Sequence, residues 1–507
     1  MTAFVLVSGM FTGAHVWEEA AARLAAAGAE VHAVALNGLD GPGGAAGAGV
    51  DLETHIADVL AVIDKVGTAP RREVVLVGHD YGIHPVVGAA DRRAERIARI
   101  VYLDAGMPQD GVPALAAVSD RSLRRRVAAL AATDGTDADV LPPPAREEWQ
   151  RWGSTAGVSD EALDRLTARA APQPLGTLLQ PLRLTGAVAA VPTTGVLCTG
   201  SGASIEMLQM RVSFGDPALR ALADARVAFF ELRTGHWPML SCPAELAEVL
   251  LRAAAGEGHR LEPAGAGQPP AHLRPFLLEV PELPRERHGN IDLYLPEAQG
   301  PRPAVVFVHG GPVPAEARPT PRDSPTMTGY ARYAAGLGVV GVTLDHRLHD
   351  LGDFERAAAD VAAAVEFVRG DARVDAGRVA LWFFSAGGLV AADWLGAPPV
   401  WLRCVAATYP VLAPLPNWGL TDSRFHPVDA VAGAGALPVV LTRAGLEMPE
   451  IAGTVKEFLA SAEACGADVE VVDVPHGRHG FETLGPTEES REAVRRAMRS
   501  VLGHLTA

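Results

Sequence analysis

The fold is decided by the stretch Val74-Val75-Leu76-Val77-Gly78-His79-Asp80-Tyr81-Gly82. A second stretch, Arg378 to Phe384 followed by Ser385-Ala386-Gly387-Gly388, repeats its pattern. Each begins with a run of apolar residues that is typical of a buried strand. Each run ends at a turn that contains glycine, a residue that tolerates tightly folded backbone. The pattern predicts a strand, a sharp turn and a helix at both places.

The surroundings of the two turns are also alike. An apolar strand pattern at residues 4–7 ends at Ser8-Gly9, and one at residues 304–308 ends at His309-Gly310-Gly311. Gly9 precedes Asp80 by 71 residues, and Gly310 precedes Ser385 by 75 residues. Strands that alternate with helices favour mostly parallel sheets with helices on both faces. The sequence therefore predicts two α/β domains in tandem.

The ends of the two copies define the domain boundaries. Each copy closes with a strand pattern, a His and an amphipathic helix, and the His is His236 in the first copy and His479 in the second. The turn and the His are 156 residues apart in the first copy and 94 in the second. We expect most of the extra residues, about 109–192, to form a helical lid. The stretch 256–274, rich in Gly, Pro and Ala, is expected to link domain 1–255 to domain 275–507.

The composition and net charge of the chain indicate which kinds of binding partner to expect. The 507 residues include 60 acidic and 44 basic side chains, and the formal net charge of −16 disfavours nucleic acid and anionic membranes as partners. The N-terminal apolar run is too short for a signal peptide, and no run approaches the roughly 20 apolar residues of a membrane span. The four cysteines lack the spacing of a zinc or redox site. We expect a cytoplasmic protein that acts on a small molecule without a metal or other cofactor; whether it forms a homo-oligomer is left open.

The first turn resembles the nucleophile elbow of the α/β-hydrolase superfamily, written G-x-S-x-G when the nucleophile is Ser. Asp80 stands at the Ser position of this pattern. A carboxylate is suited to displacement at a saturated carbon, which gives an alkyl ester that a His-activated water hydrolyses. The pattern is similar to epoxide hydrolases and haloalkane dehalogenases, and this resemblance implies Asp80 as nucleophile and His236 as base.

The same resemblance implies an acid that orients His236 and N–H donors that polarise an oxyanion. Asp104 follows the next strand after the elbow helix, where one subgroup of haloalkane dehalogenases has its acid, and Glu206 is the alternative. The expected donors are Gly9, Met10 and Tyr81. The loop Ser8 to Ala14 looks like that of small plant-type esterases and hydroxynitrile lyases, which supports the fold and leaves the reaction open.

The first copy departs from these families in its pocket residues. Epoxide hydrolases protonate the leaving oxygen with lid tyrosines, but residues 109–192 contain no Tyr. Dehalogenases usually hold the halide with a Trp directly after the nucleophile, where this chain has Tyr81. The candidate substrate-binding residues are Trp149 and Trp152 in the lid and His15 in the first loop; a packing role is the alternative for each.

The second turn resembles that of acetyl-esterases and hormone-sensitive-lipase-like enzymes. His309-Gly310-Gly311 matches their oxyanion motif, so the expected donors are Gly310, Gly311 and Ala386. Ser385, Glu447 and His479 follow one another in the order nucleophile, acid, base. Phe383 occupies the first Gly position of the elbow, which implies either a relaxed turn or an impaired copy.

These patterns favour a tandem hydrolase. The first domain would open an epoxide or a related electrophilic carbon through an Asp80 ester, and the second would hydrolyse carboxylic esters through Ser385. Two alternatives stay open: one copy is a non-catalytic binding or scaffold domain, or Asp80 is an acid or base in a lyase or cyclisation reaction. The substrate, its stereochemistry and the oligomeric state are not specified by the sequence.

Overall fold

The computed structural model divides the chain into two compact units. The first contains Met1–Val212 and Pro217–Pro263, and the second contains Ser213–Asp216 and Ala264–Ala507. The described residues are 2–39, 41, 49–66, 73–118, 120–131, 140–214, 217–263, 269–415, 418, 420 and 424–506. Residues 264–268 of the predicted linker and 119 and 132–139 of the predicted lid lie outside them.

The first unit is built on a parallel sheet. Within the described residues its strand order is β2-β1-β3-β4-β7-β8, and every neighbouring pair is parallel. The strands are β1 (Thr2–Val7), β2 (Glu30–Ala33), β3 (Glu73–His79), β4 (Ile97–Leu103), β7 (Thr193–Cys198) and β8 (Val227–Leu232). Their runs of Val, Leu and Ile are buried on both faces of the sheet, as expected for parallel strands covered by helices.

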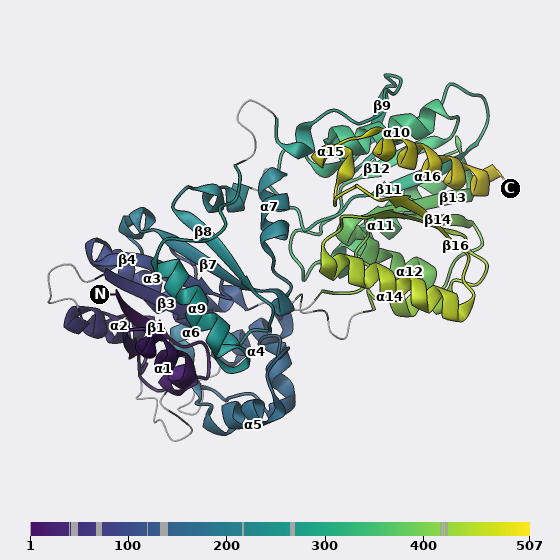
Figure 1. Ribbon diagram of the computed structural model, residues 1–507. Coiled ribbons are helices and arrows are strands. Elements are labelled where there is room, and N and C mark those ends of the chain that lie inside the picture. Colours follow the sequence, from purple (N-terminus) through teal and green to yellow (C-terminus); the bar gives the residue numbers. More distant parts are fainter. Residues whose placement is uncertain are drawn as a thin grey trace. The chain divides into compact units, whose positions relative to one another are not determined.

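Helices cover this first sheet (Figure 1). Helix α1 packs beside α9, and α2 packs beside α3. The helices outside the lid are α1 (Glu18–Ala26), α2 (Leu52–Val66), α3 (Ile83–Arg92), α7 (Ile205–Ser213), α8 (Pro238–Ser241) and α9 (Pro243–Ala254). The apolar spacing that predicted α2 places Ile56, Val59 and Ile63 in the core.

The residues between β4 and β7 include the predicted helices, joined by irregular segments. They form α4 (Arg121–Ala131), α5 (Asp160–Arg169), α6 (Leu175–Leu179) and a short antiparallel pair, β5 (Val140–Leu141) with β6 (Gln173–Pro174). The side chains of Leu123, Trp149 and Leu178 join the apolar core of the unit. The insertion is therefore packed against the domain rather than extended from it.

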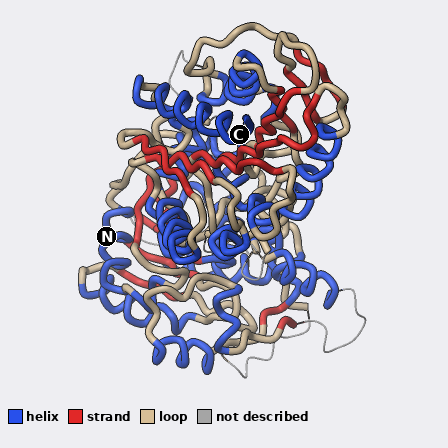
Figure 2. Tube along the Cα trace, turned by 90° about the vertical axis from the view of Figure 1, so that its right-hand side faces the viewer, coloured by secondary structure: helices blue, strands red, loops and turns tan. Residues whose placement is uncertain are grey.

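The second unit has a mixed sheet of eight strands among the residues that are described. Its order is β9-β10-β12-β11-β13-β14-β15-β16; the β9–β10 and β10–β12 pairs are antiparallel and the remaining pairs are parallel. The strands are β9 (Arg285–His288), β10 (Ile291–Tyr294), β11 (Arg302–Val308), β12 (Val340–Leu344), β13 (Val374–Phe384), β14 (Leu402–Thr408), β15 (Val439–Ala444) and β16 (Val469–Val474). In Figure 2 the strands of each unit run between helices.

Helices α10 and α16 cover one face of this sheet and α11, α12 and α14 the other (Figure 1). The helices are α10 (Pro325–Gly336), α11 (Phe354–Arg369), α12 (Ala392–Leu395), α13 (Pro427–Ala430), α14 (Pro449–Cys465), α15 (Phe481–Leu484) and α16 (Glu488–Thr506). Trp382 and Phe384 belong to the core under α10 and α16. Because side chains alternate along a strand, Phe383 faces the opposite side.

The two sheets share one strand order. Without β9 and β10, the second reads β12-β11-β13-β14-β15-β16, which matches β2-β1-β3-β4-β7-β8 position by position. In both, the strand that leads to a predicted nucleophile has equivalent neighbours: β3 lies between β1 and β4, and β13 lies between β11 and β14. None of the helices in the described parts of the chain is long and apolar enough to cross a membrane.

Candidate active sites

The first elbow lies at the end of β3, where Asp80 has a left-handed φ of 49°. Bulky residues adopt this region at a cost, so the surrounding structure must hold it. Two glycines make the turn tight enough. A Cβ on Gly78 would lie 2.6 Å from the Ile83 Cα, and one on Gly82 would collide with the carbonyl oxygen of Ser8. The glycines that predicted an elbow are therefore required by the backbone.

The Asp80 carboxylate divides its two oxygens between two partners. The Met10 N–H donates a hydrogen bond to Oδ2 at 3.0 Å. Oδ1 lies 3.9 Å from Nε2 of His236, and 23% of the Asp80 side chain is exposed. Gly9 makes room for this arrangement, because a Cβ there would lie 2.8 Å from Oδ2. One oxygen is thus held by a backbone donor while the other faces the His.

His236 is oriented by Asp104, the preferred acid of the sequence analysis. Its Nδ1 lies 2.7 Å from Asp104 Oδ2. The Ser201 hydroxyl donates to the same Oδ2 at 2.7 Å, and the Cys198 N–H donates to Oδ1 at 3.2 Å. Glu206, the alternative acid, lies in α7. The position beside Nδ1 is occupied by Asp104.

The charges of this site reinforce one another. Burial by itself lowers the pKa of His236, but hydrogen bonds and charge from Asp104 and Asp80 outweigh it and raise the pKa to about 10. Burial raises the pKa of Asp80, yet His236 and the Met10 N–H bring it to about 2. At neutral pH the site therefore contains an imidazolium between two carboxylates.

The second elbow has the same backbone strain. Ser385 follows β13 with a φ of 51°. A Cβ on Gly387 would lie 2.5 Å from the His309 carbonyl oxygen, and one on Gly310 would lie 2.8 Å from the Ser385 Cβ. The turn is not relaxed, although Phe383 replaces the first glycine of the elbow. Gly388 stands where the first elbow has Ile83, and a Cβ on Gly388 would lie 2.8 Å from the Val411 carbonyl oxygen.

The three predicted side chains of the second unit form a continuous hydrogen-bond chain. Ser385 Oγ lies 2.7 Å from His479 Nε2, and His479 Nδ1 lies 2.8 Å from Glu447 Oε2. The side chains of His479 and Glu447 are only 7% and 4% exposed. The Met448 N–H donates to Glu447 Oε1 at 2.9 Å and fixes the carboxylate. The expected donors Gly310, Gly311 and Ala386 border Ser385 on the loop after β11 and on the turn itself.

Comparisons with known proteins identify the family of this chain. A family model described as "Alpha/beta hydrolase family" matches residues 4–249, and one described as BD-FAE matches residues 291–394. The carbendazim hydrolyzing esterase of Nocardioides sp. (strain SG-4G) is 32% identical over 258 residues, which are 49% of this chain and 98% of that protein. The chain belongs to the alpha/beta hydrolase family.

Solved structures of this family were also found. An extracellular alpha/beta-hydrolase from Paenibacillus has 22% identity and a TM-score of 0.40, and the match covers 50% of this chain and 99% of that one. A methylesterase from Arabidopsis has 20% identity and a TM-score of 0.38, with 51% and 100% covered.

The lid of this alpha/beta hydrolase covers the His236 loop. Ser154 and Ala156 accept hydrogen bonds from the N–H groups of His236 and Gly235 at 2.7 and 2.8 Å. Gly153 lies so close that a Cβ there would be 2.5 Å from the His236 ring. The insertion is thus part of the site wall.

The predicted substrate-binding residues have different environments. Trp149 is 1% exposed and donates its ring N–H to Thr167 at 2.9 Å, so it is a packing residue of the lid. Trp152 is partly buried, and its ring centroid lies 4.9 Å from that of Phe11. His15 lies in the short helix Ala14–Trp17, and burial lowers its pKa. No hydrogen bond or ion pair among the described residues joins His15 to Asp80 or His236.

Tyr81 brings only its backbone to the site. Its hydroxyl lies 2.8 Å from Nδ1 of His55, and the side chain is 2% exposed. The ring therefore anchors the elbow in the core and cannot act on a leaving group. Within the described part of the chain, no three His, Cys, Asp or Glu side chains are grouped to hold a metal ion.

Several residues near the two centres were missed by the sequence analysis. His79 hydrogen-bonds the His236 carbonyl oxygen at 2.7 Å, and burial and the His236 charge lower its pKa to about 4. In the second unit the Tyr409 ring lies 4.7 Å from that of His479. Tyr330 donates to the buried Glu482 at 2.8 Å, and burial raises the pKa of Glu482. Only the position of His79 inside the elbow offered a signal; the other contacts join distant segments.

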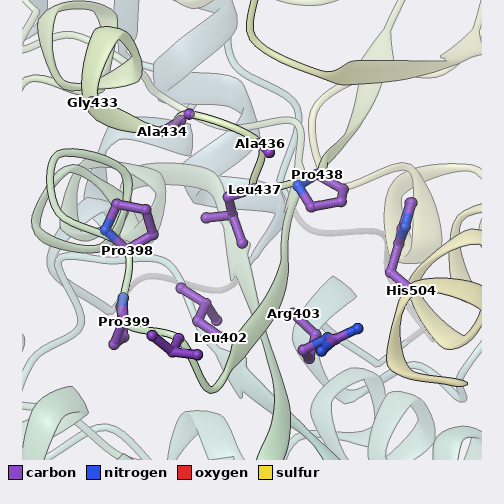
Figure 3. Close-up of a pocket in the computed structure, with 12 residues that line it drawn as sticks. Pro398, Pro399, Leu402, Arg403, Gly433, Ala434, Ala436, Leu437, Pro438 and His504 are labelled. Carbon is purple, nitrogen blue, oxygen red and sulfur yellow. The ribbon is translucent and has the colours of Figure 1, made fainter. Parts of the chain in front are cut away.

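A hollow of about 510 Å³ lies in the second unit (Figure 3), and Ser385 is not among the residues that line it. Leu402 at the start of β14 and Pro438 just before β15 line it, together with Arg403 and His504. The nucleophile turns follow the carboxyl ends of the strands, so the hollow lies at the opposite edge of the sheet. It contains none of the predicted site residues.

Proposed function

We propose that the chain is a tandem hydrolase whose second domain hydrolyses carboxylic esters through Ser385. The observation that carries this proposal is the unbroken hydrogen-bond chain from Ser385 through His479 to Glu447. A Ser held in the left-handed region with its hydroxyl on a His nitrogen is prepared to lose its proton as it attacks a carbonyl carbon.

The proposed reaction has two steps. His479 takes the proton of Ser385 while Oγ attacks the ester carbonyl, and the N–H groups of the Gly310-Gly311 loop and Ala386 stabilise the oxyanion. The protonated His479 then gives its proton to the leaving alcohol. Water, deprotonated by the same His, hydrolyses the acyl-enzyme. Glu447 holds the tautomer of His479 and stabilises the imidazolium.

Short-chain aryl esters test this assignment. Ser385→Ala is expected to lower kcat/KM by about 10³-fold or more, since the nucleophile is removed. Asp80→Asn is the matched control in the first unit and is expected to leave aryl-ester turnover unchanged. Equal turnover by wild type and Ser385→Ala would sink the assignment.

The first domain is proposed to open epoxides or related electrophilic carbons through Asp80. The split environment of the carboxylate supports this route. Oδ1 would attack a saturated carbon, and Oδ2, already paired with the Met10 N–H, would become the carbonyl oxygen of the alkyl ester. As the epoxide C–O bond breaks, the leaving oxygen takes the proton of the His236 imidazolium. Esterification removes the negative charge of Asp80, which lowers the pKa of His236 and favours this proton transfer. The neutral His236 then deprotonates the water that hydrolyses the ester.

The relative's name offers a competing chemistry for this domain. Carbendazim hydrolysis is the activity named for a protein that resembles the first half. If Asp80 attacked an acyl carbon, the product would be a labile mixed anhydride rather than an alkyl ester. General-base action of Asp80, without a covalent bond, is the other alternative.

Turnover in ¹⁸O-labelled water separates these routes. A panel of epoxides and alkyl halides, with carbendazim added, is incubated with Ser385→Ala protein. The alkyl-ester route predicts solvent oxygen in the Asp80 carboxylate and a stalled Asp80 adduct in His236→Ala. If Asp80 is required for carbendazim hydrolysis and no epoxide is consumed, the alkyl-ester route is wrong and attack on an acyl carbon takes its place. Substrate consumption without any adduct would favour acid or base catalysis.

A further inference from the structure

The oxyanion loop of the first unit contains a strained residue. Phe11 has a φ of 63°, follows the donor Met10 directly and is fully buried. A bulky residue in the left-handed region is strained and persists only where neighbouring contacts hold it. The position of the Met10 N–H therefore depends on what fixes Phe11.

Two contacts from the lid hold Phe11. Its N–H donates to the side-chain oxygen of Gln173 at 3.0 Å, and its carbonyl oxygen accepts from the Ala171 N–H at 2.9 Å. Gln173 is 0% exposed. The Gln173 amide is itself oriented, because its Nε2 donates to Thr177 Oγ1 at 2.7 Å. The Thr177 hydroxyl in turn donates to the Pro174 carbonyl oxygen at 2.6 Å.

The same cluster reaches the second donor of the site. The Tyr81 hydroxyl is a hydrogen-bond partner of Thr177 as well as of His55. Tyr81 carries the N–H that follows the nucleophile, and Phe11 adjoins Met10. Buried polar networks that are fully paired fix one geometry, because breaking one bond leaves a costly unpaired group. The network thus ties the lid to both backbone donors.

We propose that Gln173 is a positioning residue that aims the oxyanion donors of the first site at Asp80. This inference rests on the proposed covalent role of Asp80. When water attacks the alkyl ester, the carbonyl oxygen becomes an oxyanion on Oδ2, the atom that the Met10 N–H already contacts. Full charge develops there only in the hydrolytic step. Loss of Gln173 should therefore slow ester hydrolysis more than bond opening.

The second unit supports its loop differently. Its donors are Gly310 and Gly311, and the preceding His309 is stacked on His346 at a centroid distance of 3.7 Å. His346 also hydrogen-bonds the His309 carbonyl oxygen at 2.8 Å. Both of these contacts lie within the second unit, so ester turnover at Ser385 serves as an internal control for any Gln173 variant.

The test measures the two half-reactions of the first site in the full chain. Rapid-quench mass spectrometry follows formation and decay of the Asp80 adduct with a consumed epoxide. Gln173→Met removes the acceptor at similar volume, and its adduct is expected to decay about 10-fold or more slowly while formation changes little. Gln173→Glu keeps an acceptor oxygen and should recover most of the decay rate. Thr185→Val, which loses a lid hydrogen bond to Asp91, is the matched control.

The outcomes separate this inference from the proposed function. Adduct decay at the wild-type rate in a folded Gln173→Met protein would overturn the positioning role while leaving the covalent route intact. Absence of any adduct in His236→Ala would overturn the covalent route and the role of Gln173 with it. If Gln173→Met does not fold, Thr177→Val frees the same amide, and unchanged decay in that variant would equally overturn the inference.

Discussion

The ends of β4 and β14 occupy equivalent places in the two sheets but carry different residues. Asp104 has a φ of 43° and donates its N–H to the Val196 carbonyl oxygen at 2.9 Å. Tyr409 has a φ of 36° and donates its N–H to the Thr442 carbonyl oxygen, also at 2.9 Å. The acid of the first site is thus replaced by an aromatic ring in the second.

After the neighbouring strands, β7 and β15, the carboxylate is found in the second unit instead of the first. Val196 and Thr442 occupy equivalent positions, because they pair with the last residues of β4 and β14. Ser201 lies five residues after Val196, and Glu447 lies five residues after Thr442. Glu447, the predicted acid of the second site, lies beside His479, whereas Ser201 donates a hydrogen bond to Asp104. A carboxylate thus reaches the His from one place in the first unit, at 2.7 Å, and from another place in the second, at 2.8 Å. The unused place supports the used one: Ser201 bonds the acid, and Tyr409 packs on the His ring.

The largest expected effect comes from removing each acid. Asp104→Ala should slow adduct hydrolysis, and Glu447→Ala should slow ester turnover, each by about 10²–10⁴-fold, because the His loses its orienting partner. Adding Ser201→Glu to Asp104→Ala should restore about 10-fold by the same argument, since Ser201 stands where the second site has its acid. Rapid-quench kinetics measures both. If adduct hydrolysis does not recover in the double variant, the two acid positions are not equivalent.

The next prediction concerns one glycine in each elbow, Gly78 and Gly388, where a Cβ would meet neighbouring atoms. Gly78→Ala places a Cβ 2.6 Å from the Ile83 backbone, so it should destabilise the first unit by about 1–3 kcal/mol. In the second unit, a Cβ on Gly388 would lie 2.8 Å from the Val411 carbonyl oxygen, so Gly388→Ala should destabilise that unit to a similar extent. Gly453→Ala, with open space around it, is the control. Denaturant unfolding that shows Gly78→Ala to be as stable as the control would contradict this explanation.

A smaller effect concerns pH in the first unit. The pKa of His236 is raised from 6.5 to about 10, so its interactions with Asp104 and Asp80 stabilise the fold fully below pH 6.5. This contribution is lost as the pH rises from 6.5 through 10. In Asp104→Asn the pKa of His236 should fall, and the alkaline loss of stability should shrink. NMR titration of His236 with melting curves between pH 6 and 10 measures both; an unchanged pKa in Asp104→Asn would remove the ion pair as the cause.

Much of the architecture was readable in the sequence because it depends on local patterns. The strand runs before Gly78 and Ser385, the glycines after each nucleophile and the 71- and 75-residue spacing predicted two similar α/β units with a helical insertion in the first. The antiparallel pair β9 and β10 was missed, since its four-residue strands are too short for a clear alternation. The packing role of Trp149 was left open because its partner, Thr167, becomes known only from the fold.

The sequence by itself determined the sheets, the two sharp turns and the order of nucleophile, acid and base, because strand runs, glycine and chain order are local properties. Tertiary structure alone decided which carboxylate lies beside His236 and that Gln173 reaches the oxyanion loop 162 residues away. These depend on which strand ends and lid segments meet in space. The separation of two residues along the chain does not predict such a contact, because sheet register and lid packing decide which segments are neighbours.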